Sequence, residues 1–110
     1  MISTPATHPQ EMTLSEYLTR WQGRPIQVID VRERDEWDTG HMPEATHVPL
    51  SELEQRRNEL DPGKPVVIVC RSGRRSLVAA AYLAERGFRS VRSLAGGMIA
   101  WAAAGQPVER

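Results

Sequence analysis

The chain has 110 residues and a mass of 12.3 kDa, which suits one domain and leaves no room for an internal duplication. It carries 14 basic and 14 acidic side chains, and 40% of its residues are hydrophobic. This composition is that of a soluble globular protein and excludes a disordered, collagen-like or coiled-coil chain. With a formal net charge of zero and no apolar run near the roughly 20 residues that cross a bilayer, we expect neither nucleic acid nor a membrane as a partner.

Residues 1–12 show no hydrophobic periodicity and lack the basic and apolar regions of a secretory leader. We therefore expect an irregular lead-in, a single domain over residues 13–108 and a cytoplasmic location. Thr13 and Glu16 have the spacing of a capping box, which predicts a short helix ending near Gly23.

The rest of the chain alternates between β-branched apolar runs and segments with helical patterns. The predicted strands cover residues 26–31, 66–69 and 91–94, and the predicted helices cover residues 51–60, 76–86 and 98–104. Such alternation, with right-handed crossovers, predicts an α/β fold with a central parallel β-sheet and helices on both faces.

The most informative segment is a buried strand that ends in Cys70, followed by a basic loop over residues 71–76 and a helix. Ligands of open α/β sheets gather beyond the carboxyl ends of the strands. Inward N–H groups of such a loop form a cradle for an anion, either a substrate oxyanion or the thiolate itself. The helix N-terminus and the guanidiniums of Arg71, Arg74 and Arg75 favour a charged sulfur, so Cys70 is predicted to be a reactive nucleophile.

A purely structural interpretation of the cysteine and of the arginines competes with this functional one. A lone cysteine at the end of a buried strand is most often an inert small hydrophobe, and arginines most often lie on a solvated loop. Three arginines within the five residues that follow Cys70 argue against inertness, because they are costly to desolvate without an anion. At Arg75, the expected helix start, a cation opposes the helix dipole unless a negative group compensates it.

The loop resembles the active-site loop of the rhodanese family of sulfurtransferases in its single-domain form, Cys-Arg-x-Gly-x-Arg-Ser. Two flanking segments are similar to the amino-terminal and carboxy-terminal motifs of the family: VIDVRERDEWDTGHMPEATHVPL, residues 28–50, and SLAGGMIAWAAAGQPV, residues 93–108. The three segments occur in order and at the family's spacing. Glu44 departs from the pattern, since the family usually has glycine there, and this change can alter a turn.

The resemblance implies a rhodanese-like fold and an enzyme that moves a sulfane sulfur from thiosulfate or a related persulfide donor to a thiophilic acceptor, cyanide or a thiol. Cys70 would carry the sulfur as a persulfide in a ping-pong mechanism. The substrate would be bound by the rest of the loop: Arg71, Ser72, Gly73, Arg74, Arg75 and Ser76. Neither a metal nor an organic cofactor is called for, and the partners would be the small-molecule donor and acceptor, or a sulfur-carrier or thiol protein in their place.

Two other functions compete with sulfur transfer. Phosphatases and arsenate reductases also place a cysteine thiolate in an anion-binding loop before a helix. Their signature has five residues between cysteine and arginine, whereas four separate Cys70 from Arg75, and this tighter ring suits a sulfur atom better than a tetrahedral oxyanion. The second alternative is an interaction module, which rhodanese-like domains that lack the cysteine provide, and the presence of Cys70 argues against it.

A few further residues have two interpretations. Asp30 and Arg32 end a strand whose carboxyl edge faces the same site, so either could shape the loop; alternatively, Arg32 forms an ion pair with Glu36. His41 has the chemistry of a general base, but a structural histidine in a turn is the better interpretation. The pair Gly96-Gly97 predicts a close backbone approach, because no phosphate-loop pattern surrounds it.

Overall fold

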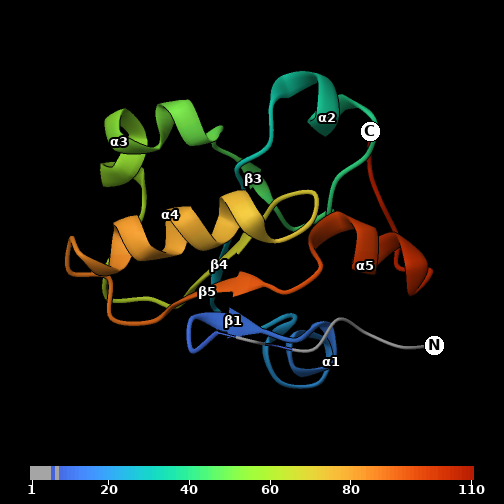
Figure 1. Ribbon diagram of the computed structural model, residues 1–110, viewed down its shortest axis with the longest axis horizontal. Helices are drawn as coiled ribbons and strands as arrows, with labels where there is room; N and C mark the ends of the chain where they lie inside the picture. Colours follow the sequence, from blue (N-terminus) through green and yellow to red (C-terminus); the bar gives the residue numbers. More distant parts are fainter. Residues whose placement is uncertain (1–5, 7) are drawn as a thin grey trace.

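A five-stranded parallel sheet lies at the centre of the structure, a computed structural model that describes residue 6 and residues 8–110 (Figure 1). Its spatial strand order is β1-β5-β4-β2-β3. The strands are β1 (Glu11–Met12), β2 (Gln27–Asp30), β3 (Thr46–His47), β4 (Val66–Val69) and β5 (Val91–Leu94). The predicted α/β fold with a parallel sheet is confirmed.

Helices cover both faces of this sheet, as predicted. Figure 1 shows α3 and α4 on one side of the strands and α1 on the other. The helical segments are α1 (Leu14–Glu16) with its π-helical continuation η1 (Tyr17–Trp21), α2 (Arg34–Asp38), η2 (Leu50–Glu52), α3 (Leu53–Arg56), η3 (Arg57–Glu59), α4 (Arg74–Ala84) and α5 (Gly97–Ala103). No helix in the described part of the chain is long and apolar enough to span a membrane.

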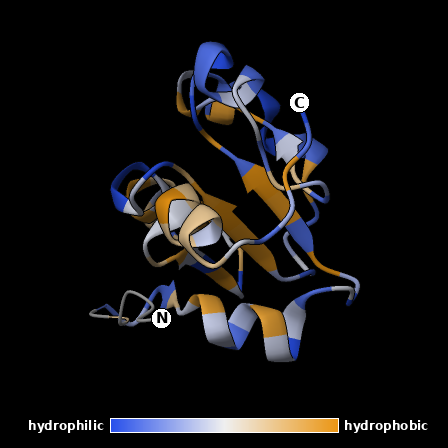
Figure 2. Ribbon diagram, turned by 90° about the vertical axis from the view of Figure 1, so that its right-hand side faces the viewer, coloured by the Kyte–Doolittle hydropathy of each residue, from blue (hydrophilic) through white to orange (hydrophobic). Residues whose placement is uncertain are grey.

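The hydrophobic core consists of two clusters, one on each face of the sheet. Side chains alternate along β4, so that Ile68 packs with Leu83 of α4 while Val67 and Val69 pack with Trp101 of α5. All four residues of β4 are buried, as expected for a central strand of a parallel sheet. Figure 2 shows the resulting hydrophobic strands between helices that carry both apolar and polar positions.

The folded region extends beyond the predicted boundaries at both ends. Glu11 and Met12, which fall in the expected irregular lead-in, form the edge strand β1 and pair with β5. At the other end, Glu109 forms an antiparallel bridge with His41. The first five residues and residue 7, also in the expected lead-in, lie outside the described residues.

Several local predictions differ from the structure. The Thr13 cap is confirmed, since its Oγ1 accepts a hydrogen bond from the Glu16 N–H at 3.0 Å. The helix expected over residues 51–60 instead starts as a 3₁₀ turn at Leu50, and α3 follows without a side-chain cap. The helix expected over residues 76–86 begins at Arg74, because Gly73 already serves as its N-cap.

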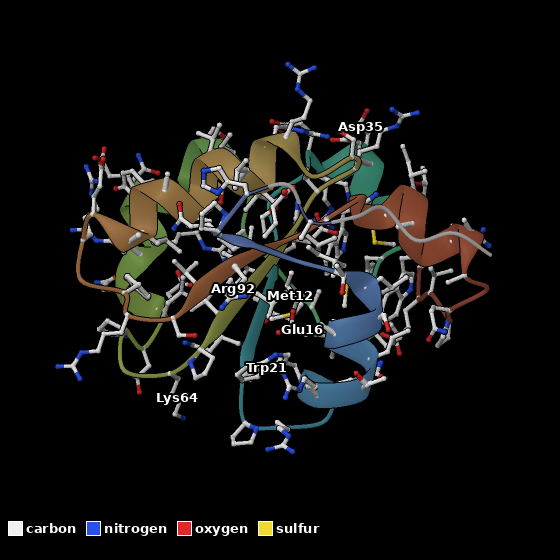
Figure 3. The ribbon with its side chains drawn as sticks, turned by 60° about the horizontal axis from the view of Figure 1, so that its bottom comes forward. Met12, Glu16, Trp21, Asp35, Lys64 and Arg92 are labelled. Atoms are coloured by element: carbon white, nitrogen blue, oxygen red, sulfur yellow. The ribbon has the colours of Figure 1, made fainter. Side chains whose placement is uncertain are left out.

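The sheet brings the carboxyl ends of β2 and β4 to one end of the molecule. Asp35 follows β2 and Lys64 precedes β4, and Figure 3 shows the two at opposite ends of the view. Cys70 directly follows β4, on the same end as Asp35. The residues considered for chemistry therefore lie where parallel sheets place their ligands.

Candidate active site

Cys70 lies beneath the loop that joins β4 to α4, with only 1% of its surface exposed. Its Sγ accepts hydrogen bonds from the N–H groups of Gly73 at 3.1 Å and Ser76 at 3.4 Å. The Oγ of Ser76 lies 3.3 Å from the same sulfur. The predicted inward-facing cradle is present, and in this structure it encloses the sulfur.

Gly73 gives the loop its shape. Its φ of +101° lies in the left-handed region, which glycine adopts without strain, and this turn directs its N–H at the sulfur. A Cβ on Gly73 would meet the backbone nitrogen of Gly96 at 3.3 Å. Because α4 begins immediately afterwards, the N–H groups of Arg74 and Arg75 belong to its first turn and have no acceptor among the described residues.

The first turn of α5 supports the loop from outside. The Met98 N–H donates to the carbonyl oxygen of Cys70 at 2.8 Å, and the Ile99 N–H donates to that of Arg71 at 3.1 Å. A Cβ on Gly97 would overlap the carbonyl oxygen of Cys70 and lie 2.6 Å from that of Arg71. The close backbone approach predicted at the glycine pair is thus confirmed.

The surroundings of Cys70 act on its pKa in opposite directions. Burial raises the pKa of the thiol, as an apolar environment does. The hydrogen bond from the Ser76 hydroxyl, and then those from the N–H groups of Ser76, Gly73 and Ser72, lower the pKa and outweigh burial. The net pKa lies below that of an ordinary cysteine, and hydrogen bonds rather than guanidiniums are the main cause.

Arg75 pairs with Glu36 of α2, and both side chains stay partly exposed. Its two terminal nitrogens donate to the two carboxylate oxygens at 2.7 and 2.8 Å. The carboxylate offsets the unfavourable interaction of this cation with the positive end of the α4 dipole. In turn, the guanidinium holds the pKa of Glu36 at about 2. The ion pair considered between Arg32 and Glu36 is therefore wrong, since Arg75 takes this place.

Arg71 and Arg74 are exposed, and neither makes an ion pair or side-chain hydrogen bond with another described residue. Arg71 lines a cavity of about 390 Å³ beside the loop. The cavity is also lined by Arg32, Asp35, Glu36, Thr39, Met98, Ile99 and Ala102. A small anion in this cavity would meet the free guanidinium of Arg71.

Asp30 and Arg32 form a buried pair next to the site. Arg32 Nη2 lies 2.8 Å from Asp30 Oδ2 and also donates to the carbonyl oxygen of Gly40 at 2.8 Å. These contacts fix the turn after β2, and neither side chain hydrogen-bonds to the cysteine loop. His41 stacks on Trp37 with ring centroids 3.5 Å apart, which is a structural role.

The buried hydroxyls of Ser76 and Ser93 form a series of contacts that starts at the Cys70 sulfur. Ser76 Oγ is 2.7 Å from Ser93 Oγ, and Ser93 Oγ donates to the carbonyl oxygen of Gly73 at 3.3 Å. Both serines are fully buried. Among the described residues, no group of three or more His, Cys, Asp or Glu is arranged to hold a metal ion.

Comparison with known proteins identifies the family of this site. The sequence profile described as Rhodanese-like domain matches residues 13–104. The chain belongs to the rhodanese-like family. It is 40% identical over 83 residues to a protein of Allochromatium vinosum named "Sulfurtransferase", covering 76% of this chain and 78% of the relative.

Two further comparisons concern domain organisation and fold. "Putative sulfur carrier protein YrkF" of Bacillus subtilis is 41% identical over 69% of this chain, which spans only 41% of that relative's length. The crystal structure of a rhodanese-related protein from Thermoplasma volcanium superposes with a TM-score of 0.82 and 26% identity. The match covers 91% of this chain and 97% of the other.

The rhodanese-like domain has a specific use for Glu44, the residue that departs from the family pattern. The hydroxyl of buried Tyr17 donates to Glu44 Oε2 at 2.6 Å, and Gln22 donates to the same oxygen at 3.2 Å. Burial, and then Glu44, raise the pKa of Tyr17. No non-glycine residue in the described chain has a positive φ, so the turn accommodates Glu44 without backbone strain.

Sequence reasoning missed two residues of this rhodanese-like site. Glu36 was considered only as a partner of Arg32, although the uncompensated cation at Arg75 already required a nearby carboxylate. Ser93 drew no attention, although a serine inside a buried strand needs a hydrogen-bond partner. In both cases the signal was a charge or polar group without a partner nearby in the sequence.

Proposed function

We propose that this rhodanese-like domain is a sulfurtransferase that accepts a sulfane sulfur on Cys70 from thiosulfate or a related persulfide donor and passes it to cyanide or a thiol. The names of its relatives support sulfur transfer as the general chemistry. The observation that carries the proposal is the buried Cys70 sulfur held by the hydroxyl of Ser76 and the N–H groups of the loop, which lower its pKa. A thiolate is the nucleophile that such a reaction needs.

In the first half-reaction, the Cys70 thiolate attacks the outer sulfur of thiosulfate. A bond forms between Sγ and that sulfur, while the sulfur–sulfur bond of thiosulfate breaks and its electron pair leaves on sulfite. Three negative charges enter and three remain, one on the persulfide and two on sulfite. No oxidant, reductant or proton is consumed.

In the second half-reaction, cyanide or a thiolate attacks the outer sulfur of the persulfide. The bond between the two sulfurs breaks, and the electron pair returns to Sγ as the thiolate. The outer sulfur carries the negative charge in between, and the N–H groups of Arg74 and Arg75 are donors without an acceptor at the start of α4. We assign the stabilisation of the persulfide to these two groups.

The loop residues then divide the work of substrate binding. Arg71 and Arg74 are the free cations that would bind the anionic end of the donor. Arg75 would act through its pair with Glu36, which holds the loop in place. Ser72, Gly73 and Ser76 would contribute backbone N–H groups and the hydroxyl.

Donor and acceptor could also be proteins. A sulfur-carrier or thiol protein would present its sulfur at the cavity that Arg71 of the loop lines. A reducing compartment such as the cytoplasm suits the resting thiol, because oxidation of Cys70 would remove the nucleophile.

A steady-state assay tests the proposal. The wild-type protein should form thiocyanate from thiosulfate and cyanide, with parallel double-reciprocal lines as cyanide is varied. Cys70→Ser should fold and form none, because its oxygen cannot hold the sulfur as a persulfide. Thiocyanate production by the serine variant, or intersecting lines for the wild type, would contradict the proposed mechanism.

A further inference from the structure

Cys70 is joined through two buried hydroxyls to a backbone carbonyl. The contacts run from Sγ to Ser76 Oγ at 3.3 Å, from there to Ser93 Oγ at 2.7 Å, and on to the Gly73 carbonyl oxygen at 3.3 Å. Ser93 lies on β5 and belongs neither to the loop nor to α4. A 2.7 Å separation is the usual length of a good O–H···O hydrogen bond, so the central contact is well formed.

When Cys70 is a neutral thiol, the hydrogen atoms of these three contacts have one consistent arrangement. The thiol donates to Ser76, Ser76 donates to Ser93, and Ser93 donates to the Gly73 carbonyl. Each hydroxyl then donates once and accepts once, which is within its capacity.

When Cys70 is a thiolate, the direction of the first two contacts reverses. Ser76 donates to the sulfur, and Ser93 rotates its hydrogen from the Gly73 carbonyl to Ser76. The carbonyl does not lose its only partner, because it also accepts from the Leu77 N–H at 3.3 Å. The series of hydrogen bonds ends at the Gly73 carbonyl, which has no proton to give. The two hydroxyls therefore only reorient, and the thiol proton leaves to solvent.

We propose that Ser93 is a positioning residue that stabilises the Cys70 thiolate by orienting the hydroxyl of Ser76 toward the sulfur. In the ionised state both O–H dipoles point at the negative charge, and hydrogen bonds in such a chain polarise one another. This inference deepens the proposed function and rests on it, because the thiolate is both the attacking and the leaving group of the transfer.

The charges around the sulfur stay the same when Ser93 is replaced. Arg75 is paired with Glu36, and Arg32 is paired with Asp30. Among the described residues, the remaining ionisable groups near the loop are exposed Arg71, Arg74, Asp35 and Glu33, while Gly97 and Met98 of α5 carry no charge. On β5, Arg92 directs its guanidinium to the carbonyl oxygen of Glu11.

The test compares Ser93→Val with Ser93→Thr, which have the same shape and differ in the hydroxyl. The rate of Cys70 alkylation by iodoacetamide is followed against pH, with thermal melting as the control for folding. We expect the valine variant to raise the apparent pKa of Cys70 by roughly 0.5–1 unit, because a hydrogen bond to a charged group is stronger than a neutral one by a free energy of about this size. At a pH below the pKa, alkylation should then slow about three- to tenfold. Threonine should restore most of the wild-type profile.

A double-mutant comparison separates this role from a general loss of packing. In a Ser76→Ala background, Ser93→Val should not change the pH profile further, because the hydroxyl through which it acts is gone. An unchanged profile in Ser93→Val alone, or the same shift in both backgrounds, would overturn the inference. Ser93→Ala, which adds no atoms to the core, replaces the valine variant if valine prevents folding.

The readout also distinguishes this inference from the proposed function. Alkylation measures the resting thiol and needs no sulfur donor. A wild-type protein that accepts no sulfur would refute sulfur transfer while the alkylation profiles still decide the role of Ser93.

Discussion

Arg75 and Glu36, 39 residues apart in the sequence, form a two-pronged ion pair with N···O distances of 2.7 and 2.8 Å. The pair joins the first turn of α4 to α2. Glu36 Oε1 also accepts a hydrogen bond from the Glu33 N–H at 3.0 Å. The same carboxylate therefore both caps α2 and holds the cysteine loop. Its negative charge compensates a cation that would otherwise oppose the dipole of α4.

Replacing this carboxylate should cost stability in a pH-dependent way. The pKa of Glu36 falls from 4.5 to about 2, chiefly through Arg75, so its contribution is complete above about pH 4.5 and is lost as the pH falls toward 2. At pH 7, Glu36→Gln should lower the free energy of unfolding by about 1 kcal/mol, because solvent screens this partly exposed pair. Urea titrations should show the difference from wild type shrinking below pH 4.5, and a constant difference down to pH 2 would contradict this assignment.

The contact of α5 with the loop predicts a severe effect of a single methyl group. Gly97→Ala places a Cβ against two backbone oxygens, which cannot move aside without opening the loop. Gly105→Ala is the matched control, since Gly105 also has a positive φ but nothing within 4 Å of a Cβ. In urea unfolding, we expect a loss of about 1 kcal/mol for the control and about 2–4 kcal/mol for Gly97→Ala. Equal losses would show that the backbone contact does not matter.

The two free arginines of the loop should act on donor binding. Arg71→Ala and Arg74→Ala should each raise the KM for thiosulfate about fivefold with little change in kcat, because an exposed ion pair contributes up to about 1 kcal/mol. Arg75→Ala should also lower the melting temperature, since it breaks the pair with Glu36. Arg89→Ala is the control, because Arg89 is an exposed arginine in the connection between α4 and β5. Wild-type KM values for both loop variants would assign donor binding to the backbone N–H groups alone.

Phosphatase activity should be weak. Only four residues separate Cys70 from Arg75, and the guanidinium that would bind a phosphate in a longer loop is engaged by Glu36. Hydrolysis of p-nitrophenyl phosphate, measured beside thiocyanate formation on one preparation, should show a much lower kcat/KM. Comparable values for the two reactions would refute the argument from loop length.

The sequence predicts the central elements of this fold because their signals are local. The run Val66–Val69 is apolar and β-branched, and Gly73 marks the turn before α4. The missed elements lack such signals. Helix α2 exposes most of its side chains and has Glu33 at its N-cap, and β1 has two residues whose strand character comes from pairing with β5.

The part of the site that the sequence predicts also has local signals, and the part that it does not predict lacks them. Cys70 and the loop are contiguous, so their geometry follows from one strand, one turn and one helix start. Glu36 and Ser93 reach the loop from α2 and β5, and only the order of the strands brings them there. Cys70 is almost fully buried at the end of β4, and the hydrogen bonds of the loop lower the pKa of its thiol despite this burial.

Intact-mass spectrometry tests the central claim most directly. The reduced protein is incubated with thiosulfate, desalted and weighed, with Cys70→Ser treated in parallel. The wild type should gain the mass of one sulfur atom and lose it again on addition of cyanide, while the serine variant should stay unchanged. A wild-type mass that does not change, or an equal gain in the serine variant, would contradict sulfur transfer through a Cys70 persulfide.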